Sequence, residues 1–324
     1  MVGHVSSSNM FQRFLHSQVT GALLLIATTV IALVWANSVW GQYYYDLSHT
    51  YLGIRFGDAE FKLTLSYWIK DGLMAIFFFV VGLEIKREVV VGELSSVDKA
   101  MLPVCAALGG AVVPAAVYAW LNMGTEGASG WGIPMATDIA FALGVLSLFG
   151  SRVPVSLKVF LTALAIADDL LAVAVIAIFY TPDLNVGMLA LAFLTIGLML
   201  LAGRMGIRAT WVYALLAIIV WIDLLGSGVH ATVAGVLVAM VIPVRPVIDP
   251  GKFMDAAGAL LEEARGKDNS LDALIHDSRR RNSLSQLALT VEDAIPPATA
   301  LEHRLHPVTS FVILPLFALF SAGV

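Results

Sequence analysis

The chain has 324 residues, of which 59% are apolar and 13% are charged, whereas a soluble domain has roughly 45–50% apolar and 25% charged residues. This composition excludes a single soluble core and indicates a polytopic membrane protein. The net charge of −5 shows no basic face, so we expect no nucleic-acid partner. The lone cysteine, Cys105, excludes an intramolecular disulfide framework and a cysteine-built metal site.

Long apolar runs predict membrane-spanning helices, because about 20 apolar residues cross a hydrocarbon core of roughly 30 Å. Only helices or closed barrels satisfy the backbone there, and the runs lack the alternation of barrel strands. Nine runs occur, near residues 19–37, 65–85, 101–122, 131–150, 155–180, 185–203, 209–226, 228–243 and 307–324. The predicted fold is therefore an all-α helical bundle with helices 1 to 8 in residues 1–243, a soluble insertion at 244–305 and helix 9 at 306–324.

The distribution of lysine and arginine predicts the orientation of these spans. The N-terminus and the even-numbered connections carry 16 of the 19 basic residues, while the odd-numbered connections carry only Arg55 and Lys62. Cytoplasmic connections are enriched in basic residues. We therefore expect the N-terminus and the insertion to face the cytoplasm.

The insertion at 244–305 is the polar part of the chain, with 18 of the 43 charged residues. It begins with several prolines and then shows helical periodicity, which predicts two or three amphipathic helices with flexible joints. Its run Arg279-Arg280-Arg281 is interpreted as a solvated charge run, with a lipid-headgroup or regulatory patch as the alternative.

Two adjacent aspartates, Asp168 and Asp169, lie near the middle of the predicted span 155–180. An ionisable residue at mid-bilayer costs roughly 2.5–3.5 kcal/mol, so it indicates a functional site by default. Adjacent helical residues point about 100° apart, so one carboxylate can line a cavity while the other faces a neighbouring helix. The pair can bind a small hard cation or protons, and crowding disfavours both together. The alternative is a structural pair of protonated acids.

A second intramembrane acid, Asp138, follows Pro134 and Thr137 in the predicted span 131–150. The proline predicts a broken helix near Pro134–Asp138, whose free backbone groups would face a cavity. Asp138 would then compensate the positive end of a half-helix and Thr137 would supply a neutral oxygen. A proline kink with a buried structural acid is an equal alternative.

Other titratable residues lie at the predicted ends of spans and are candidates for a pH response, namely Glu84, His230, Glu302, His303 and His306. Histidine titrates near neutral pH, although an ordinary hydrogen-bonding role is the alternative for each. Glu84 belongs to an interfacial ion cluster that could be a cytoplasmic funnel or simply solvated. On a helix, the side chains of Asp71 and its neighbour Lys70 point in different directions, so we expect Asp71 to pair with a residue on another element.

Six stretches together resemble the NhaA family of bacterial sodium/proton antiporters. They are FFVVGLEIKRE (78–88), ATDIAFAL (136–143), GSRVPVSL (150–157), ALAIADDL (163–170), SGVHATVAG (227–235) and LEHRLHPVTSFVILPLFALFSAGV (301–324). They follow the family order across the chain. The family is itself a standard example of transporters built from inverted repeats with broken helices at a midplane site.

The resemblance implies an electrogenic exchanger of the bacterial inner membrane that expels Na⁺ or Li⁺, imports more than one proton per cation and is activated at alkaline pH. It implies no cofactor and no enzymatic activity. By motif match, Asp169 is the principal ion carboxylate and Asp168 is its partner. Asp138 and Thr137 would compensate the free helix ends at the crossing of the broken helices. Glu84 and the Glu302–His303 region would take part in the pH response. The oligomeric state stays open, with a homodimer as one candidate.

Two departures from the family pattern keep other hypotheses open. Residues 246–300 replace a short family connection, and the chain ends before the last three family helices, so that the second core repeat is absent. A non-transporting fragment or membrane subunit is therefore the alternative to an active antiporter. An intramembrane aspartyl protease is disfavoured, because its two aspartates face each other from separate helices and share a proton.

Overall fold

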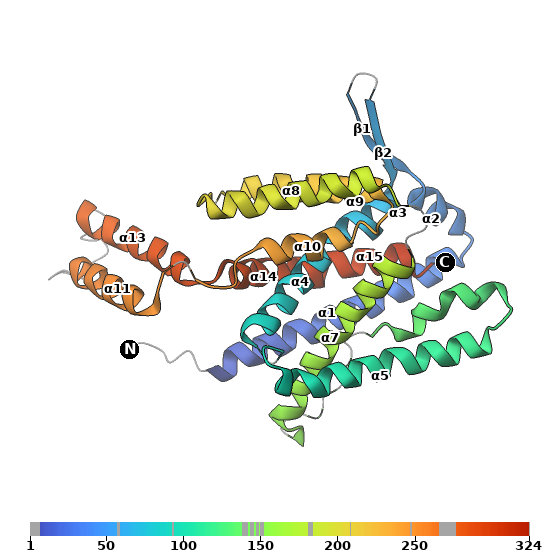
Figure 1. The fold of residues 1–324 in the computed structure, drawn as a ribbon, viewed down its shortest axis with the longest axis horizontal. Helices are drawn as coiled ribbons and strands as arrows, with labels where there is room; N and C mark the ends of the chain where they lie inside the picture. Colours follow the sequence, from blue (N-terminus) through green and yellow to red (C-terminus); the bar gives the residue numbers. More distant parts are fainter. Residues whose placement is uncertain are drawn as a thin grey trace. The chain divides into compact units, whose positions relative to one another are not determined.

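The computed structural model describes residues 7–323, except for 57–58, 93, 138–141, 143–145, 147–148, 150–151, 181–183, 208, 247 and 266–276. The chain divides into two compact units. Unit 1 comprises residues 1–241 and 304–324, and unit 2 comprises residues 242–303. Both units are helical (Figure 1), unit 1 as its apolar runs predict and unit 2 as the helical periodicity of the insertion predicts.

Unit 1 contains most of the helices, together with short 3-10 and π segments. They are α1 (Ser7–Ala36), α2 (Gly41–Ser48), α3 (Leu65–Tyr67), the π-helix η1 (Trp68–Leu73), α4 (Met74–Val91), α5 (Val97–Leu121), the 3-10 helix η2 (Glu126–Met135), α7 (Val155–Phe179), α8 (Val186–Arg204), α9 (Thr210–Ser227), α10 (Val233–Val241), the π-helix η4 (Thr309–Ile313) and α15 (Leu314–Ser321). The helix α14 (Pro297–Val308) leads into η4.

Within the described residues, five helices are long and apolar enough to cross a membrane: Val97–Leu121, Val159–Phe179, Val186–Arg204, Thr210–Ser227 and Pro297–Ser321. The pair Leu23–Ala36 and Gly41–Ser48 passes the same test together and is bent by 112°. The chain is therefore a multi-pass membrane protein. The count of nine spans stays a prediction, because the predicted span 65–85 is interrupted by η1 and residues 131–150 are only partly described.

The predicted span 228–243 is shorter in the structure than in the prediction. The helix α9 ends at Ser227, because Gly228 adopts a left-handed conformation with φ of 84°. Glycine at this position ends a helix without the steric penalty of a side chain. Turns follow, and α10 begins only at Val233 and has nine residues.

The structure also contains an antiparallel hairpin that the helical prediction missed. Strand β1 (Tyr51–Phe56) pairs with β2 (Ala59–Thr64), in the register Tyr51↔Thr64 to Phe56↔Ala59. It projects from unit 1 beyond α2 and α3 (Figure 1). The Lys62 ammonium lies 4.8 Å from the centroid of the Tyr51 ring, a cation–π contact between the two strands.

Glycines bring α4 and α10 into close contact. A Cβ on Gly235 would overlap the Ala75 carbonyl oxygen and lie 2.6 Å from the Phe79 nitrogen, and a Cβ on Gly82 would lie 2.8 Å from that of Ala239. Small residues let membrane helices approach closely where lipid offers no hydrophobic driving force. The backbone approach of α4 and α10 therefore requires glycine at both positions.

Two π-helices interrupt the apolar helices of unit 1. The segment η1 lies between α3 and α4, and η4 lies between α14 and α15. Such insertions concentrate at functional sites and leave backbone carbonyls that need partners. One partner is visible, because the Trp221 Nε1 of α9 donates to the Asp71 carbonyl of η1 at 3.3 Å, while Trp221 stacks on Trp68 at 5.7 Å.

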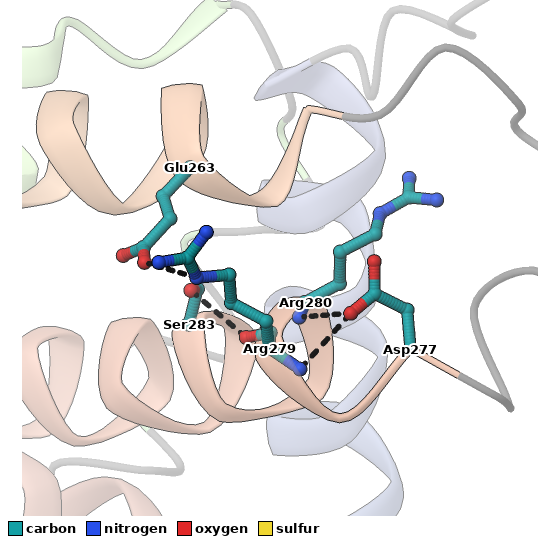
Figure 2. Close-up of polar contacts among 5 residues, drawn as sticks. All are labelled: Glu263, Asp277, Arg279, Arg280 and Ser283. Atoms are coloured by element: carbon teal, nitrogen blue, oxygen red, sulfur yellow. Dashed lines mark hydrogen bonds and ion pairs between the residues drawn. The ribbon is translucent and has the colours of Figure 1, made fainter.

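Unit 2 contains α11 (Pro250–Ala264) and α13 (Ser278–Ala294), which pack against each other. Figure 2 shows Arg279 pairing with Glu263 across the two helices, at 3.6 Å between Nε and Oε1. Arg280 is 8% exposed, and its Nε donates to the Ala264 carbonyl at 2.8 Å. The expectation of a solvated arginine run was therefore wrong for Arg280, which caps the C-terminus of α11.

Asp277 fixes the start of α13. Its Oδ1 accepts hydrogen bonds from the backbone nitrogens of Arg279 and Arg280, at 3.0 and 3.3 Å (Figure 2). Asp249 does the same for α11 by accepting from the Gly251 nitrogen at 2.9 Å, with Pro250 in the first turn. Both helices of unit 2 thus begin at aspartates that satisfy free backbone donors.

Candidate functional site

The two central aspartates lie in the middle of α7, in a stretch of small and apolar residues. Ala165, Ile166 and Ala167 precede them and are buried. Asp168 is 3% exposed and Asp169 is partly buried. The apolar sequence makes this segment a membrane helix, so both carboxyl groups must be satisfied by protein or water.

Asp168 meets a hydroxyl group from a break between helices. The Thr137 hydroxyl donates to Asp168 Oδ2 at 2.5 Å, across 31 residues of sequence. Thr137, which we expected to supply a neutral oxygen beside Asp138, thus lies directly on one of the two predicted ion carboxylates.

The break itself is visible in the residues before Thr137. The 3-10 helix η2 ends at Met135, and Ala136 is extended with φ of −73° and ψ of 137°. Pro134 removes a backbone donor and disfavours continuation of an α-helix. The predicted interruption near Pro134 is therefore present, although the segment before it is a 3-10 helix rather than an α-helix. Asp138 lies outside the described residues.

Aromatic side chains hold η2 against the end of α7. The Tyr180 hydroxyl donates to the Ser129 carbonyl at 2.9 Å and accepts from the Gly132 nitrogen at 3.1 Å. The Trp131 ring meets Phe179 edge to face at 5.3 Å. These contacts link η2, which leads directly to Thr137, to the helix that carries Asp168.

The helix α4 packs against the same part of α7. Ile166 of α7 forms a buried cluster with Val81 and Ile85 of α4. Glu84 is partly buried on α4, between these two contact residues. Lys86 follows Glu84 by two residues on α4, and its ammonium donates to the Met240 carbonyl of α10 at 2.7 Å. Through α4, the apolar contacts beside Asp168 are connected to α10.

The candidate pH-response residues lie in three parts of the structure. His230 lies in the connection between α9 and α10, with Nδ1 3.5 Å from the Asp71 Oδ1 of η1. The hydrogen bond to the Asp71 carboxylate raises the pKa of the imidazole above its ordinary value. This pairing supplies the partner that we expected Asp71 to find. Glu302, His303 and His306 lie on α14, with His303 exposed and the other two partly buried.

Asp223 in α9 is a buried acid that the sequence reasoning missed. It is 4% exposed, and its Oδ2 lies 3.5 Å from the hydroxyl oxygen of Thr195 in α8. The sequence could have shown it, because an aspartate inside the predicted membrane span 209–226 is itself a sign of a buried acid. Among the described residues, no group of three or more His, Cys, Asp or Glu side chains is arranged to hold a metal ion.

With this geometry established, comparison with known proteins identifies the family. The model of the family described as "Na+/H+ antiporter 1" matches residues 12–324. This chain belongs to the Na+/H+ antiporter 1 family. The family consists of transporters, and the resemblance of the six sequence stretches is thereby confirmed.

Similar proteins in this family come from several bacteria. The chain is 48% identical over 314 residues to a protein named Na(+)/H(+) antiporter NhaA from Oleidesulfovibrio alaskensis. It is 46% identical over 315 residues to the NhaA of Sulfurimonas denitrificans and 44% identical over 311 residues to that of Wolinella succinogenes. The alignments cover 96–97% of this chain and 69–70% of these three antiporters.

Proposed function

We propose that this chain is a sodium/proton antiporter in which Asp168 and Asp169 hold either a Na⁺ ion or protons. One observation carries the proposal. The Asp168 carboxyl group is buried in the middle of an apolar helix and is joined to Thr137 at the end of a broken helix, in a member of the Na+/H+ antiporter 1 family. Such breaks beside intramembrane acids characterise ion sites in transporters of this architecture.

The chemistry of the two acids supports exchange rather than simple binding. Carboxylate and hydroxyl oxygens are ligands for small hard cations, which include Na⁺ and Li⁺. Two negative charges on adjacent residues repel each other, so an unoccupied site favours protonation. A cation that neutralises the pair removes this preference and displaces the protons. Each ion therefore drives out the other, which is the requirement for antiport.

The remaining predicted site residues act around this pair. In our proposal, Asp138 compensates the positive backbone end at the helix break, and the chain needs no cofactor and catalyses no reaction. Import of more than one proton per cation makes the exchange electrogenic. Activation at alkaline pH involves titratable residues near the predicted ends of the spans: Glu84, His230, Glu302, His303 and His306.

The basic residues support an orientation for this exchange. We place the chain in the bacterial inner membrane with its N-terminus and residues 244–305 in the cytoplasm, because 16 of the 19 lysine and arginine residues fall on that side of the predicted spans. Proton entry from the opposite side would then drive Na⁺ out of the cell.

Vesicle experiments test the proposed function. Everted membrane vesicles energised by respiration should lose their pH gradient when Na⁺ or Li⁺ is added, and should keep it when K⁺ is added. Asp168→Asn and Asp169→Asn should each abolish the Na⁺ response at matched protein levels. Asp98→Asn, at an exposed acid in the first turn of α5, serves as the control. A normal Na⁺ response from both neutral variants would refute the site assignment.

A further inference from the structure

Asp223 is an intramembrane acid in the interface of α8 and α9. Both helices are long and apolar enough to cross a membrane. The Asp223 side chain and its neighbour Thr195 are each 4% exposed. Around them lies an apolar core that includes Val220, Leu224 and Ala192. A charged carboxylate in such surroundings would need a cation or several hydrogen-bond donors.

The hydroxyl of Thr195 supplies at most a weak donor for that charge. A threonine hydroxyl has one hydrogen and two lone pairs. Thr195 Oγ1 lies 3.0 Å from the Leu191 carbonyl oxygen, which can only accept, and 3.5 Å from Asp223 Oδ2. Its single hydrogen therefore goes mainly to the nearer carbonyl, in the usual bond to the preceding turn of the helix. At 3.5 Å, the Thr195 hydroxyl can give Asp223 Oδ2 only a weak, shared hydrogen bond, so an Asp223 carboxylate would be poorly stabilised there.

Charged groups on the surrounding elements do not alter this conclusion. The residues of α10, which also packs against α9, are all uncharged. On α8 the charged residue is Arg204, nine residues from Thr195 and therefore about 13 Å away along the helix. Asp71 and His230 pair with each other, and Asp71 meets α9 through Trp221, which points about 160° away from Asp223 on that helix.

We propose that Asp223 is a proton-binding site, separate from Asp168 and Asp169, whose neutral carboxylic acid form lies buried in the apolar interface of α9 and α8. The two sites differ in their donors. Thr137 Oγ1 donates to Asp168 Oδ2 at 2.5 Å, whereas Thr195 Oγ1 lies 3.5 Å from Asp223 Oδ2 and has the Leu191 carbonyl as its nearer acceptor. Because the Asp223 acid is neutral and has one neutral oxygen beside it, Na⁺ does not displace its proton.

Infrared spectroscopy of the protein in lipid tests this assignment directly. The carbonyl stretch of a protonated carboxylic acid is resolved from that of a carboxylate. In an Asp168→Asn, Asp169→Asn background, a protonated-acid band should be present at neutral pH and should disappear when Asp223→Asn is added. Asparagine is the matched replacement, because it is neutral and has nearly the same shape as the protonated acid. Absence of any band that depends on Asp223 would overturn the proposal.

Two further measurements test the role of Thr195 and the independence from sodium. Thr195→Val, which removes the hydroxyl with little change of shape, should leave the Asp223 band present, because the proton belongs to the acid. Loss of the band in Thr195→Val would overturn the proposal. In the protein with Asp168 and Asp169 intact, the Asp223 band should be the same in Na⁺ and in K⁺. Loss of the band in Na⁺ would place Asp223 in the exchange site and overturn the proposed separation.

Discussion

Gly235→Ala should destabilise the membrane unit, because α4 and α10 touch through their backbones at this residue. The added methyl group would overlap the Ala75 carbonyl oxygen and lie 2.6 Å from the Phe79 nitrogen. These are backbone atoms, which cannot move aside as a side chain can. Overpacking of this kind costs about 1–3 kcal/mol, and the contact with backbone places Gly235→Ala toward the upper end.

A matched substitution separates this effect from the general effect of removing glycine from a helix. Gly197 is an exposed glycine in α8, and a Cβ there would meet no atom within 4 Å. Gly197→Ala should be neutral or stabilise by roughly 0.5–1 kcal/mol, because alanine is the better helix former. The two variants thus make the same chemical change with opposite expected signs.

The assay is the thermal stability of the detergent-solubilised protein, measured as loss of the monodisperse elution peak after heating. For domains of 150–250 residues, 1 kcal/mol corresponds to about 2–4 °C, so Gly235→Ala should lower the midpoint by on the order of 5–10 °C. Gly197→Ala should leave it unchanged or raise it. Equal midpoints for the two variants would show that α4 and α10 are not in backbone contact at Gly235.

Three further substitutions test polar contacts of the two units. The pKa of His230 is raised by Asp71, so their pairing stabilises the fold below the unfolded-state pKa of about 6.5 and is lost as the pH rises through the higher folded-state value. At low pH, wild type should therefore be slightly more heat-stable than His230→Gln, by under about 1 kcal/mol for this half-exposed pair, and this difference should disappear as the pH rises. A difference that grows as the pH rises would contradict the pairing. Lys86→Met should destabilise α10 by about 1 kcal/mol, seen as faster hydrogen exchange at its C-terminus, because the ammonium caps a carbonyl there; Lys86→Arg should rescue it. Arg280→Ala should speed hydrogen exchange at the end of α11 whereas exposed Arg281→Ala should not, and equal effects would refute the capping role.

The sequence predicted those features that follow from composition and local pattern. The spans that became α5, α7, α8 and α9 are long apolar runs. Charges inside one of them mark Asp168 and Asp169 as candidates for a functional site, and this assignment stays a prediction. Pro134 marked the break before Thr137. These are local signals, because a helix of apolar residues and a proline each act within a few residues.

Other features depended on contacts between distant residues or on signals that were overlooked. The bond from Thr137 to Asp168 joins residues 31 positions apart, and no local pattern distinguishes it from a contact with Asp138. Apolar residues alternate along β1 and along β2, which is a strand pattern, but the helical prediction left this segment in a connection between two spans. The short α10 depends on the left-handed Gly228, whose conformation the apolar composition around it does not reveal.

Competition between Na⁺ and protons at Asp168 and Asp169 is the central claim, and proton release on Na⁺ binding tests it most directly. Purified protein in a weakly buffered solution should release protons when NaCl is added and should release none when KCl is added. Asp168→Asn and Asp169→Asn should each reduce the release, and the double variant should abolish it while the protein keeps its elution profile. Undiminished Na⁺-dependent proton release from the double variant would contradict the assignment of the exchange site to these two carboxylates.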